Sequence, residues 1–591
     1  MDASLRAELI DVATGRTPAD LLLVNGRLLN VLTREIQSVD IAIKRDRIAA
    51  VTPSSDESRK SERVIDLEGR YVTPGFMDPH VHIEGSLVTP VEFSRAVIAR
   101  GTTLVAQDPH EIANVSGIAG VEAMLAEART VPLRILLRVP GRVPGYPQDL
   151  ESTSGELSLA ETFGLLDLPE TVCLAGDYNP QWVMRGERDL LKKIERTSEL
   201  RKTVSGQPAG IQGRALSGFV AAGLEDSHVA SSVEEIIENL RLGLRTTLVM
   251  RPGRRLGRSH VCELAGVIAS RGLETRFIQL STDEVNPHDL LAEGHLDQRI
   301  RLCIEEGIEV ATAYQWATLN VAEGLKIDRD YGSVSPGKMA DLVVLDDLQS
   351  VKVRATMIGG EFLYDDGGYL RPQRADPTRF SNVRGVGLRR PLTEHDFELQ
   401  AGKPEGAIKV RAIITDTPKR QEEIELPVRS GVVQPNDNFS ILAMAECHGG
   451  SGGVGLAFVG GLHLARGAIA STVSHDAHNM LIVGQSRSDM ALAANRVAEI
   501  GGGFIAVLDG RVLCELALPV AGLMSTEPIE LVAEKLRQFE GLLLGELGCP
   551  PASQILMRFN LLSMANASSC GFSDKGLIDS ASMEAISTIV C

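Results

Sequence analysis

The stretch that decides the fold is Thr73-Pro-Gly-Phe-Met-Asp-Pro-His-Val-His-Ile-Glu84. An apolar run leads into it, Pro74-Gly75 bends the chain, and two histidines follow two positions apart. In an extended chain successive side chains alternate between faces, so His80 and His82 would point to the same side. Two neutral imidazoles side by side at the end of a strand provide half of a metal site. By itself the pair leaves two interpretations open, half of a metal centre or two polar histidines on a loop.

Length and composition bound the class of protein. The chain has 591 residues, so we expect three or four domains. Its net charge of -18 argues against nucleic acid or an anionic membrane as a partner. No apolar run reaches the length of a membrane span, and the first residues lack the pattern of a signal peptide. The eight cysteines form no closely spaced pairs, which favours reduced thiols and a cytoplasmic location.

Two distant segments share the pattern of short strands. In residues 19–71, Asn25-Gly26 predicts a hairpin turn, and Lys44 to Arg47 predicts a second one. Residues 335–364 repeat this pattern. We therefore expect residues 1–71 and 331–365 to form one composite small β domain, with the rest inserted between them. The alternative is two unrelated hairpins.

Residues 72–330 alternate between strand-like and helix-like segments. Strand-like runs include residues 102–106, 133–137, 246–250 and 276–280. This alternation predicts a parallel α/β sheet. The length of the segment is close to the roughly 250 residues of a (β/α)8 barrel.

The last third of the chain differs from the barrel segment in composition and in its pattern of strand-like and helix-like runs. Residues 366–400 are rich in Gly, Arg, Pro and Asp and are expected to be a linker. Residues 401–591 mix strand-like runs with helix-like stretches at 488–500 and 527–544. Asp509-Gly510 predicts a hairpin within this part. We expect a separate C-terminal domain of mixed α and β structure.

Several long motifs carry a family resemblance. The stretch around His80 and His82 resembles the first-strand motif of the amidohydrolase superfamily, whose members activate water on one or two metals inside a (β/α)8 barrel. Gln107-Asp-Pro-His-Glu-Ile-Ala-Asn-Val-Ser-Gly117 resembles a motif of the adenine deaminase family. Residues 289–297, 467–479 and 495–503 are similar to that family as well. The resemblance implies an α/β fold, a (β/α)8 TIM-type barrel inserted in a small composite β domain, plus an adenine-deaminase-like C-terminal domain.

The resemblance also implies a reaction, the hydrolytic deamination of adenine to hypoxanthine and ammonia by a metal-bound hydroxide. Water alone is too weak a nucleophile at neutral pH, and a divalent metal lowers its pKa. A carboxylate then moves the proton. The resemblance implies one or two divalent transition-metal ions per chain, with Mn²⁺ first and Fe²⁺ or Zn²⁺ as alternatives.

The family's site residues carry over to four positions. His80 and His82 match its first pair of metal ligands. Asp283 follows the strand at 276–280 and matches a ligand that also shuttles protons; its alternative role is a helix cap. His228 matches a catalytic and metal-binding histidine, and the alternative is a plain surface residue.

Two family ligands are missing at the predicted second metal position. Gly176 stands where the family has a glutamate, and Asp177, one residue further on, is the nearest carboxylate. Gln207 stands where the family has a histidine, and an amide is a poor ligand for a transition metal. We therefore expect either one tightly bound metal, or a second one held weakly by His228 and Asp177.

Five further residues are candidates for binding substrate. His110 and Glu111 could contact a purine or its leaving amine, or could simply begin a helix. His475, Asp476 and His478 could form another metal or substrate site, or a satisfied polar network near the mouth of the barrel.

The functional alternatives are another amidohydrolase, acting on a cyclic amide or amidine, and a catalytically weak or silent relative that binds purines. In each case the expected partner is a small molecule, neither nucleic acid nor membrane. A homo-oligomer is compatible with this architecture.

Overall fold

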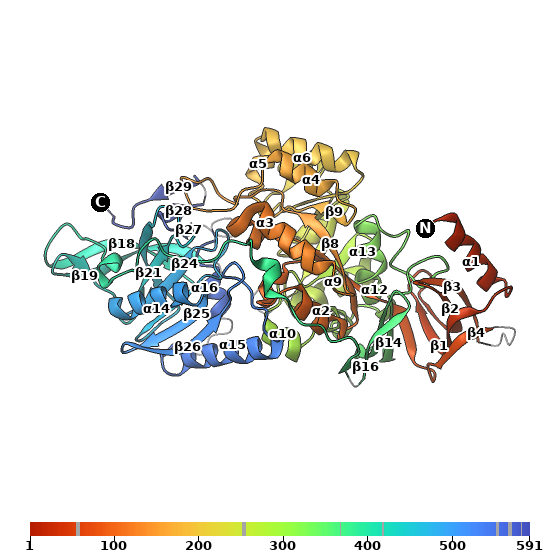
Figure 1. Ribbon diagram of the computed structural model, residues 1–591. Helices are drawn as coiled ribbons and strands as arrows, with labels where there is room; N and C mark the ends of the chain where they lie inside the picture. The colour runs from red at the N-terminus through yellow and green to blue at the C-terminus, as the bar shows by residue number, and fades with distance from the viewer. Residues whose placement is uncertain are drawn as a thin grey trace.

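The barrel lies between the two other parts of the molecule. In Figure 1 the N-terminal sheet is at one end of the molecule, the barrel is in the middle, and the C-terminal domain, in blue, is at the other end. The structure is a computed structural model that describes residues 1–54, 60–250, 256–366, 368–415, 419–550, 555–564, 570–580 and 582–590.

Eight parallel strands follow one another around the barrel in chain order. Most of their residues are buried, as expected of parallel strands covered on both faces. The last strand returns to the first through a bridge between Val81 and Asp283. The predicted (β/α)8 barrel is therefore confirmed. Its strands are β6 (Phe76–Val81), β7 (Thr102–Gln107), β8 (Arg134–Val139), β9 (Thr171–Leu174), β10 (Thr203–Gly206), β11 (Asp226–Ser227), β12 (Arg245–Val249) and β13 (Ile278–Ser281).

Helices connect the strands of the barrel. Ser232 caps one of them, α8, by accepting a hydrogen bond from the Glu235 N–H. The helix α3 consists of two helical parts joined at Gly117, whose backbone is not helical, with a φ of +57°. The helices are α2 (Pro90–Ile98), α3 (His110–Ala128), α4 (Leu159–Leu166), α5 (Gln181–Met184), α6 (Arg188–Glu199), α7 (Gly213–Ala221), α8 (Val233–Arg241), α9 (Arg258–Arg271), α10 (Pro287–Ala292), α11 (Leu296–Glu305), α12 (Val310–Trp316) and α13 (Leu319–Gly324), with the 3-10 turn η1 (Ile83–Ser86).

The segments before and after the barrel share one nine-stranded sheet. The strand β14 pairs antiparallel with β5, and β5 pairs parallel with β1. An N-terminal helix, α1 (Ala3–Ala13), which the sequence analysis does not foresee, contacts β2 and β3. The strands are β1 (Ala19–Asn30), β2 (Glu35–Lys44), β3 (Arg47–Pro53), β4 (Ser61–Asp66), β5 (Tyr71–Pro74), β14 (Leu342–Asp347), β15 (Lys352–Ile358), β16 (Glu361–Asp365) and β17 (Gly368–Tyr369).

The hairpin predicted at Asn25-Gly26 is wrong. The strand β1 runs through these residues, and its pairing with β2 shifts register there. Asn25 has a φ of +57°, and its N–H donates to Asp40 Oδ1 at 2.9 Å. The residue type that favours a left-handed turn here serves a bulge inside a strand instead. The second predicted hairpin is confirmed, since β2 and β3 pair around Lys44 and Arg47.

The C-terminal domain contains a second nine-stranded sheet and a three-stranded one. The hairpin at Asp509-Gly510 is confirmed by the pairing of Leu508 with Arg511. The domain contains β18 (Gly406–Ile414), β19 (Arg420–Arg429), β20 (Val432–Val433), β21 (Phe439–Ala445), β22 (Val454–Gly460), β23 (Ala468–Ser471), β24 (Met480–Gly484), α14 (Arg487–Glu499), β25 (Gly503–Leu508), β26 (Arg511–Ala517), α15 (Ile529–Leu544), α16 (Ile555–Asn560), β27 (Cys570–Ser573), β28 (Gly576–Asp579) and β29 (Glu584–Ile586); the turns η2 (Pro377–Phe380) and η3 (Glu394–Phe397) precede it.

One hydrophobic core joins this domain to the barrel. Val88 and Phe93 on the barrel side belong to the same buried cluster as Met444, Phe504 and Phe539. The helix α15 also contacts α10 and α2. Burial of shared apolar surface fixes the domain against the barrel, so its loops have a defined place at the barrel mouth.

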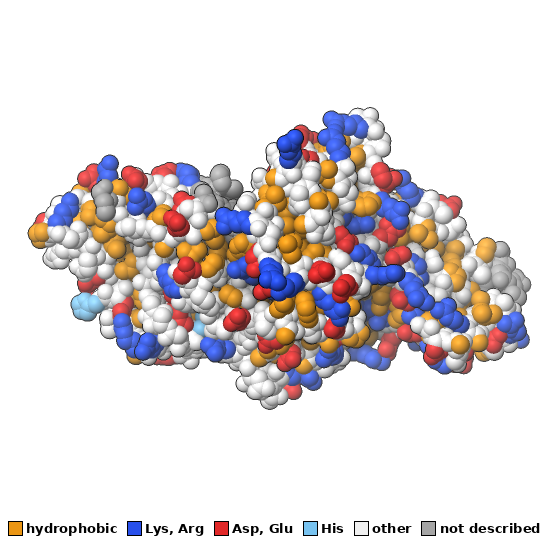
Figure 2. Space-filling model, turned by 90° about the horizontal axis from the view of Figure 1, so that it is seen from above, with side chains coloured by type: hydrophobic (Ala, Val, Ile, Leu, Met, Phe, Trp, Pro, Cys, Tyr) orange, Lys and Arg blue, Asp and Glu red, His pale blue; other side chains and the backbone are white. Residues whose placement is uncertain are grey.

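Three general features of the described residues are the charged surface, the helices and the cysteine thiols. In Figure 2 basic and acidic side chains are interspersed over the visible face. Within the described ranges, no helix is both long and apolar enough to cross a membrane. None of the cysteines in those ranges forms a disulfide.

Candidate metal centre

Five predicted site residues lie where barrel strands end. His80 is the last residue but one of β6, and His82 follows that strand directly. Asp177, His228 and Asp283 come just after β9, β11 and β13. The chemistry of (β/α)8 barrels sits at the carboxyl ends of their strands. The fold therefore brings side chains together that are far apart in the sequence.

The two histidines and Asp283 converge on one point. His80 Nε2 and His82 Nε2 are 3.0 Å apart, and Asp283 Oδ1 lies 3.3 Å from the first and 3.5 Å from the second. Burial, with help from His228, lowers the pKa of His80 well below its ordinary value, so its ring is neutral. His82 Nδ1 lies 2.8 Å from the Asp108 carbonyl oxygen, which can only accept. When the ring of His82 is neutral, its proton therefore lies on Nδ1, and Nε2 has a lone pair for a ligand bond.

Asp177 and His228 stand beside this group. Asp177 Oδ2 is 3.7 Å from His80 Nε2, and Asp177 Oδ1 is 3.4 Å from His228 Nε2. The ring of His228 stacks on that of His80 with centroids 4.1 Å apart. Gln207 Nε2 lies 3.2 Å from His228 Nε2. An amide thus occupies the space next to His228 where a further ligand would stand.

The backbone holds Asp283 in an unusual conformation. Its φ is +62°, a region that costs energy for a residue with a side chain. Its carbonyl accepts from the His82 N–H at 2.7 Å, and its own N–H donates to the His80 carbonyl at 3.2 Å. These bonds join β13 to β6 and fix the carboxylate beside the two histidines. The helix-cap alternative for Asp283 is wrong, because Asn286 caps α10.

Asp108 is a site residue that the sequence analysis missed. It follows β7 directly, and its carboxylate is buried together with His80, His82 and Asp177. Burial and the neighbouring Asp177 raise its pKa well above the ordinary value. Its position right after the strand at 102–107 was the available signal, because carboxyl ends of parallel strands meet at one edge.

The residues fit a divalent metal. Two overlapping groups have ligand atoms within 4.8 Å of one another: His80, His82, Asp108 and Asp177, and His80, His228 and Asp283. Both carboxylate oxygens of Asp108 and Oδ2 of Asp177 are buried without a hydrogen-bond partner in the described part of the chain. Buried polar atoms in native proteins normally have partners, and a cation would provide one. Imidazole and carboxylate ligands suit Mn²⁺, Fe²⁺ and Zn²⁺.

Gly176 cannot be replaced by the family's glutamate without displacing the neighbouring strand. A Cβ at this position would lie 2.5 Å from Gly206 Cα, which belongs to β10. The chain that follows β9 therefore lies against β10 without room for a side chain at this position. Asp177, one residue further on, faces the histidines instead.

Gly176→Ala should therefore destabilise the protein by about 1–3 kcal/mol, the usual cost of an overpacked core. The control is Gly164→Ala in α4, where an added Cβ would meet no atom within 4 Å. Removing a helical glycine stabilises by about 0.5–1 kcal/mol. Urea denaturation of both variants checks the opposite signs, and a Gly176→Ala protein as stable as the wild type would contradict the close approach.

A second cluster of buried polar groups faces the barrel mouth from the C-terminal domain. His475 Nδ1 lies 3.5 Å from Glu111 Oε1, and His475 Nε2 lies 3.3 Å from Glu284 Oε1. His478 Nε2 is 3.9 Å from Glu111 Oε2. The ring of His110 is 4.7 Å from that of His82, so this cluster is close to the metal centre.

The satisfied polar network that the sequence analysis offered as an alternative describes part of this region. His448 Nε2 donates to the Ala477 carbonyl at 2.9 Å, and Glu446 Oε1 accepts from the His448 N–H at 2.6 Å. The carboxylate of Asp476 accepts a hydrogen bond from Tyr146. These bonds brace the loop that carries His475 and His478.

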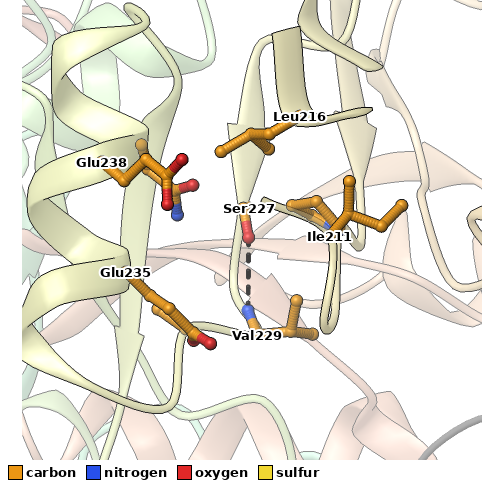
Figure 3. Close-up of a pocket in the computed structure, with 9 residues that line it drawn as sticks. Ile211, Leu216, Ser227, Val229, Glu235 and Glu238 are labelled. Carbon is orange, nitrogen blue, oxygen red and sulfur yellow. Dashed lines mark hydrogen bonds between the residues drawn. The ribbon is translucent and has the colours of Figure 1, made fainter. Parts of the chain in front are cut away.

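A small cavity of about 10 Å³ lies next to the strand that carries His228. Figure 3 shows Leu216 and Ile211 on one side of it and Glu235 and Glu238 of α8 on the other. The Val229 N–H donates to Ser227 Oγ at 3.4 Å, which holds the turn after β11. None of the predicted site residues lines this cavity, and its size admits little more than one water.

Comparison with known proteins gives three kinds of similarity. The sequence profile of the amidohydrolase family matches residues 71–363, and that of the adenine deaminase C-terminal domain matches residues 416–584. Adenine deaminase 3 of Rhizobium meliloti (strain 1021) is 37% identical over 598 residues, which cover 100% of this chain and 99% of that protein. The adenine deaminase of Moorella thermoacetica is 37% identical over 604 residues, covering 99% of this chain and 98% of that protein. A solved structure of an adenosine deaminase from Xanthomonas campestris with bound zinc covers 62% of this chain and 97% of its own, at 18% identity and a TM-score of 0.45.

Proposed function

The chain belongs to the adenine deaminase family, and we infer that it hydrolyses adenine to hypoxanthine and ammonia at the metal centre described above. The observation that carries the assignment is the convergence of His80, His82 and Asp283 on one point at the barrel mouth. Similarity over the full length to adenine deaminases supports the choice of substrate, because a fold alone does not fix a function.

The metal would be held by His80, His82, Asp177, His228 and Asp283. When bound, it acts as a Lewis acid that makes water nucleophilic near neutral pH. Asp283 is the proton carrier that we propose. Its carboxylate takes the proton of the attacking water and passes it to a ring nitrogen or to the leaving amine of the purine. His228, stacked on His80, keeps that ring in place. Burial of these side chains excludes bulk water from the reacting atoms.

We propose one tightly held ion at this centre, with Mn²⁺ as the first candidate. His80 belongs to both overlapping ligand groups, which supports a shared ion. Gln207 beside His228 is a weak ligand for a second one. Asp108 is a further ligand candidate for the same ion.

We propose that adenine lies between the metal centre and the C-terminal loop, against His110 and Asp476. Burial and the neighbouring His82 lower the pKa of His110 to about 3, so its ring is neutral and can both donate and accept. Its Nδ1 is buried without a hydrogen-bond partner among the described residues. Adenine offers matching ring nitrogens and an amine. The other three residues predicted to bind substrate are Glu111, His475 and His478. Their potential ligand atoms lie within 4.8 Å of one another, so they form a separate group.

Two further predictions concern the location of the protein in the cell and its binding partners. We propose a cytoplasmic enzyme whose partner is a small purine, and a homo-oligomer stays a prediction. The alternative function is that of another amidohydrolase, acting on a cyclic amide or amidine. It is supported by Gly176 and Gln207, which stand where the family has metal ligands.

Adenine-dependent ammonia release tests the function. Protein stripped of metal with a chelator should release no ammonia from adenine, and Mn²⁺, Fe²⁺ or Zn²⁺ should restore hypoxanthine formation. The metal bound per chain is measured in the same samples. A protein that binds metal but leaves adenine unchanged would sink the adenine assignment and move the search to cyclic amides and amidines.

A further inference from the structure

We propose that Glu111, His475 and His478 form a second site for a divalent transition metal, shared between the barrel and the C-terminal domain and separate from the catalytic centre. Glu111 comes from the first turn of α3 in the barrel. His475 and His478 come from the loop between β23 and β24 of the C-terminal domain. An ion bound there would cross-link the two parts of the chain.

The geometry of the three side chains suits one ion. Each offers one ligand atom, and these atoms lie within 4.8 Å of one another. Two imidazoles and a carboxylate are a common ligand set for zinc and related metals. None of the three belongs to the groups around His80, so the two sites do not compete for ligands.

The buried polar atoms of this cluster lack partners. Both ring nitrogens of His478 and Oε1 of Glu111 have no hydrogen-bond partner in the described part of the chain, although both side chains are almost completely buried. A neutral imidazole must donate from one nitrogen and accept at the other. Leaving such groups unsatisfied in the interior destabilises the fold. A metal ion would bind one ring nitrogen of His478 and a carboxylate oxygen of Glu111 together.

The charge around the cluster favours a cation. The carboxylates of Glu84 and Glu284 lie close enough to Glu111 to interact with it electrostatically. Carboxyl groups crowded together in the interior are stabilised when a divalent ion is bound among them.

Glu284 supplies the outer hydrogen bond that metal-binding histidines usually make. His475 Nδ1 faces Glu111, while its Nε2 faces Glu284 Oε1 at 3.3 Å. A ring that binds metal through Nδ1 would donate its Nε2–H to this carboxylate, which fixes the tautomer and orients the ring. The loop is also preorganised, since the His478 N–H donates to the Ser474 carbonyl at 3.0 Å.

Metal counting on the full chain tests the site. Purified protein is stripped with a chelator, loaded with Zn²⁺, freed of unbound ion, and analysed for metal per chain. We expect two equivalents in the wild type, and one in His478→Asn or Glu111→Gln. His80→Asn should also hold one, and the double variant His80→Asn/His478→Asn none. The matched control is His463→Asn, an exposed histidine of the same domain, which should keep both.

The outcomes separate this proposal from the proposed function. Wild-type metal content in both His478→Asn and Glu111→Gln would overturn the second site, and an increase in KM for adenine in those variants would assign the residues to purine binding instead. Circular dichroism shows whether each variant is folded. Because the readout is bound metal, the result does not depend on whether adenine is the substrate.

Discussion

Asp283→Asn is expected to lower kcat for adenine deamination by about 10²–10⁴-fold, the usual contribution of a positioned general acid–base group. The substitution keeps the size and shape of the side chain but removes the basic oxygen that would take a proton. His80 and His82, 3.0 Å apart, remain to hold the metal. The loss should therefore fall mainly on turnover, with a much smaller change in bound metal.

Steady-state kinetics, with metal measured in the same preparation, check this expectation. The control is Asp289→Asn in the first turn of α10, a carboxylate that accepts a hydrogen bond from Asn286 Nδ2 at 2.8 Å and belongs to neither ligand group of the metal centre. It should keep wild-type kcat within about twofold, as expected of a surface change. An Asp283→Asn enzyme within tenfold of the wild type would rule out Asp283 as the proton carrier.

The double variant His80→Asn/His82→Asn is expected to lose the catalytic metal and with it activity by about 10⁴-fold or more, because water activation by a metal and the proton transfer that follows are lost together. Both side chains are almost completely buried, and Asn cannot place a nitrogen lone pair where His80 Nε2 and His82 Nε2 now lie. Activity and metal per chain should fall together.

His463→Asn again serves as the control, since its side chain is exposed and lies in the other domain. Metal content falls by one equivalent in the double variant and is unchanged in the control. Adenine turnover that persists after His80 and His82 are replaced would contradict a metal centre at the end of β6.

Several features could be read from the sequence because they depend on local order. Alternating strand-like and helix-like segments predicted a parallel α/β sheet, and the motif around His80 and His82, by its resemblance to a family motif, predicted the barrel and ligands at the end of its first strand. The Asn25-Gly26 signal failed for a physical reason. Asn and Gly favour a left-handed backbone, but a bulge within β1 uses that conformation as well as a turn does.

Other features depend on contacts between distant residues. The position of Asp108 directly after a strand could be read from the sequence, but its meeting with His80 and His82 follows from the place where β7 ends beside β6. The close approach of Gly176 to Gly206 explains why no glutamate fits there, and it is visible only in the packed barrel.

The sequence by itself indicated the family, through motifs that resemble those of adenine deaminases, and the alternation of strands and helices, because both are patterns of neighbouring residues. It also predicted His80, His82 and Asp283 as metal ligands. Only the tertiary structure decided which of the potential metal-ligand side chains lie close together. Closure of β13 on β6 brings Asp283 to the histidines, and a shared hydrophobic core brings His475 and His478 to Glu111. Such distances are set by packing between segments hundreds of residues apart, which local sequence patterns do not specify.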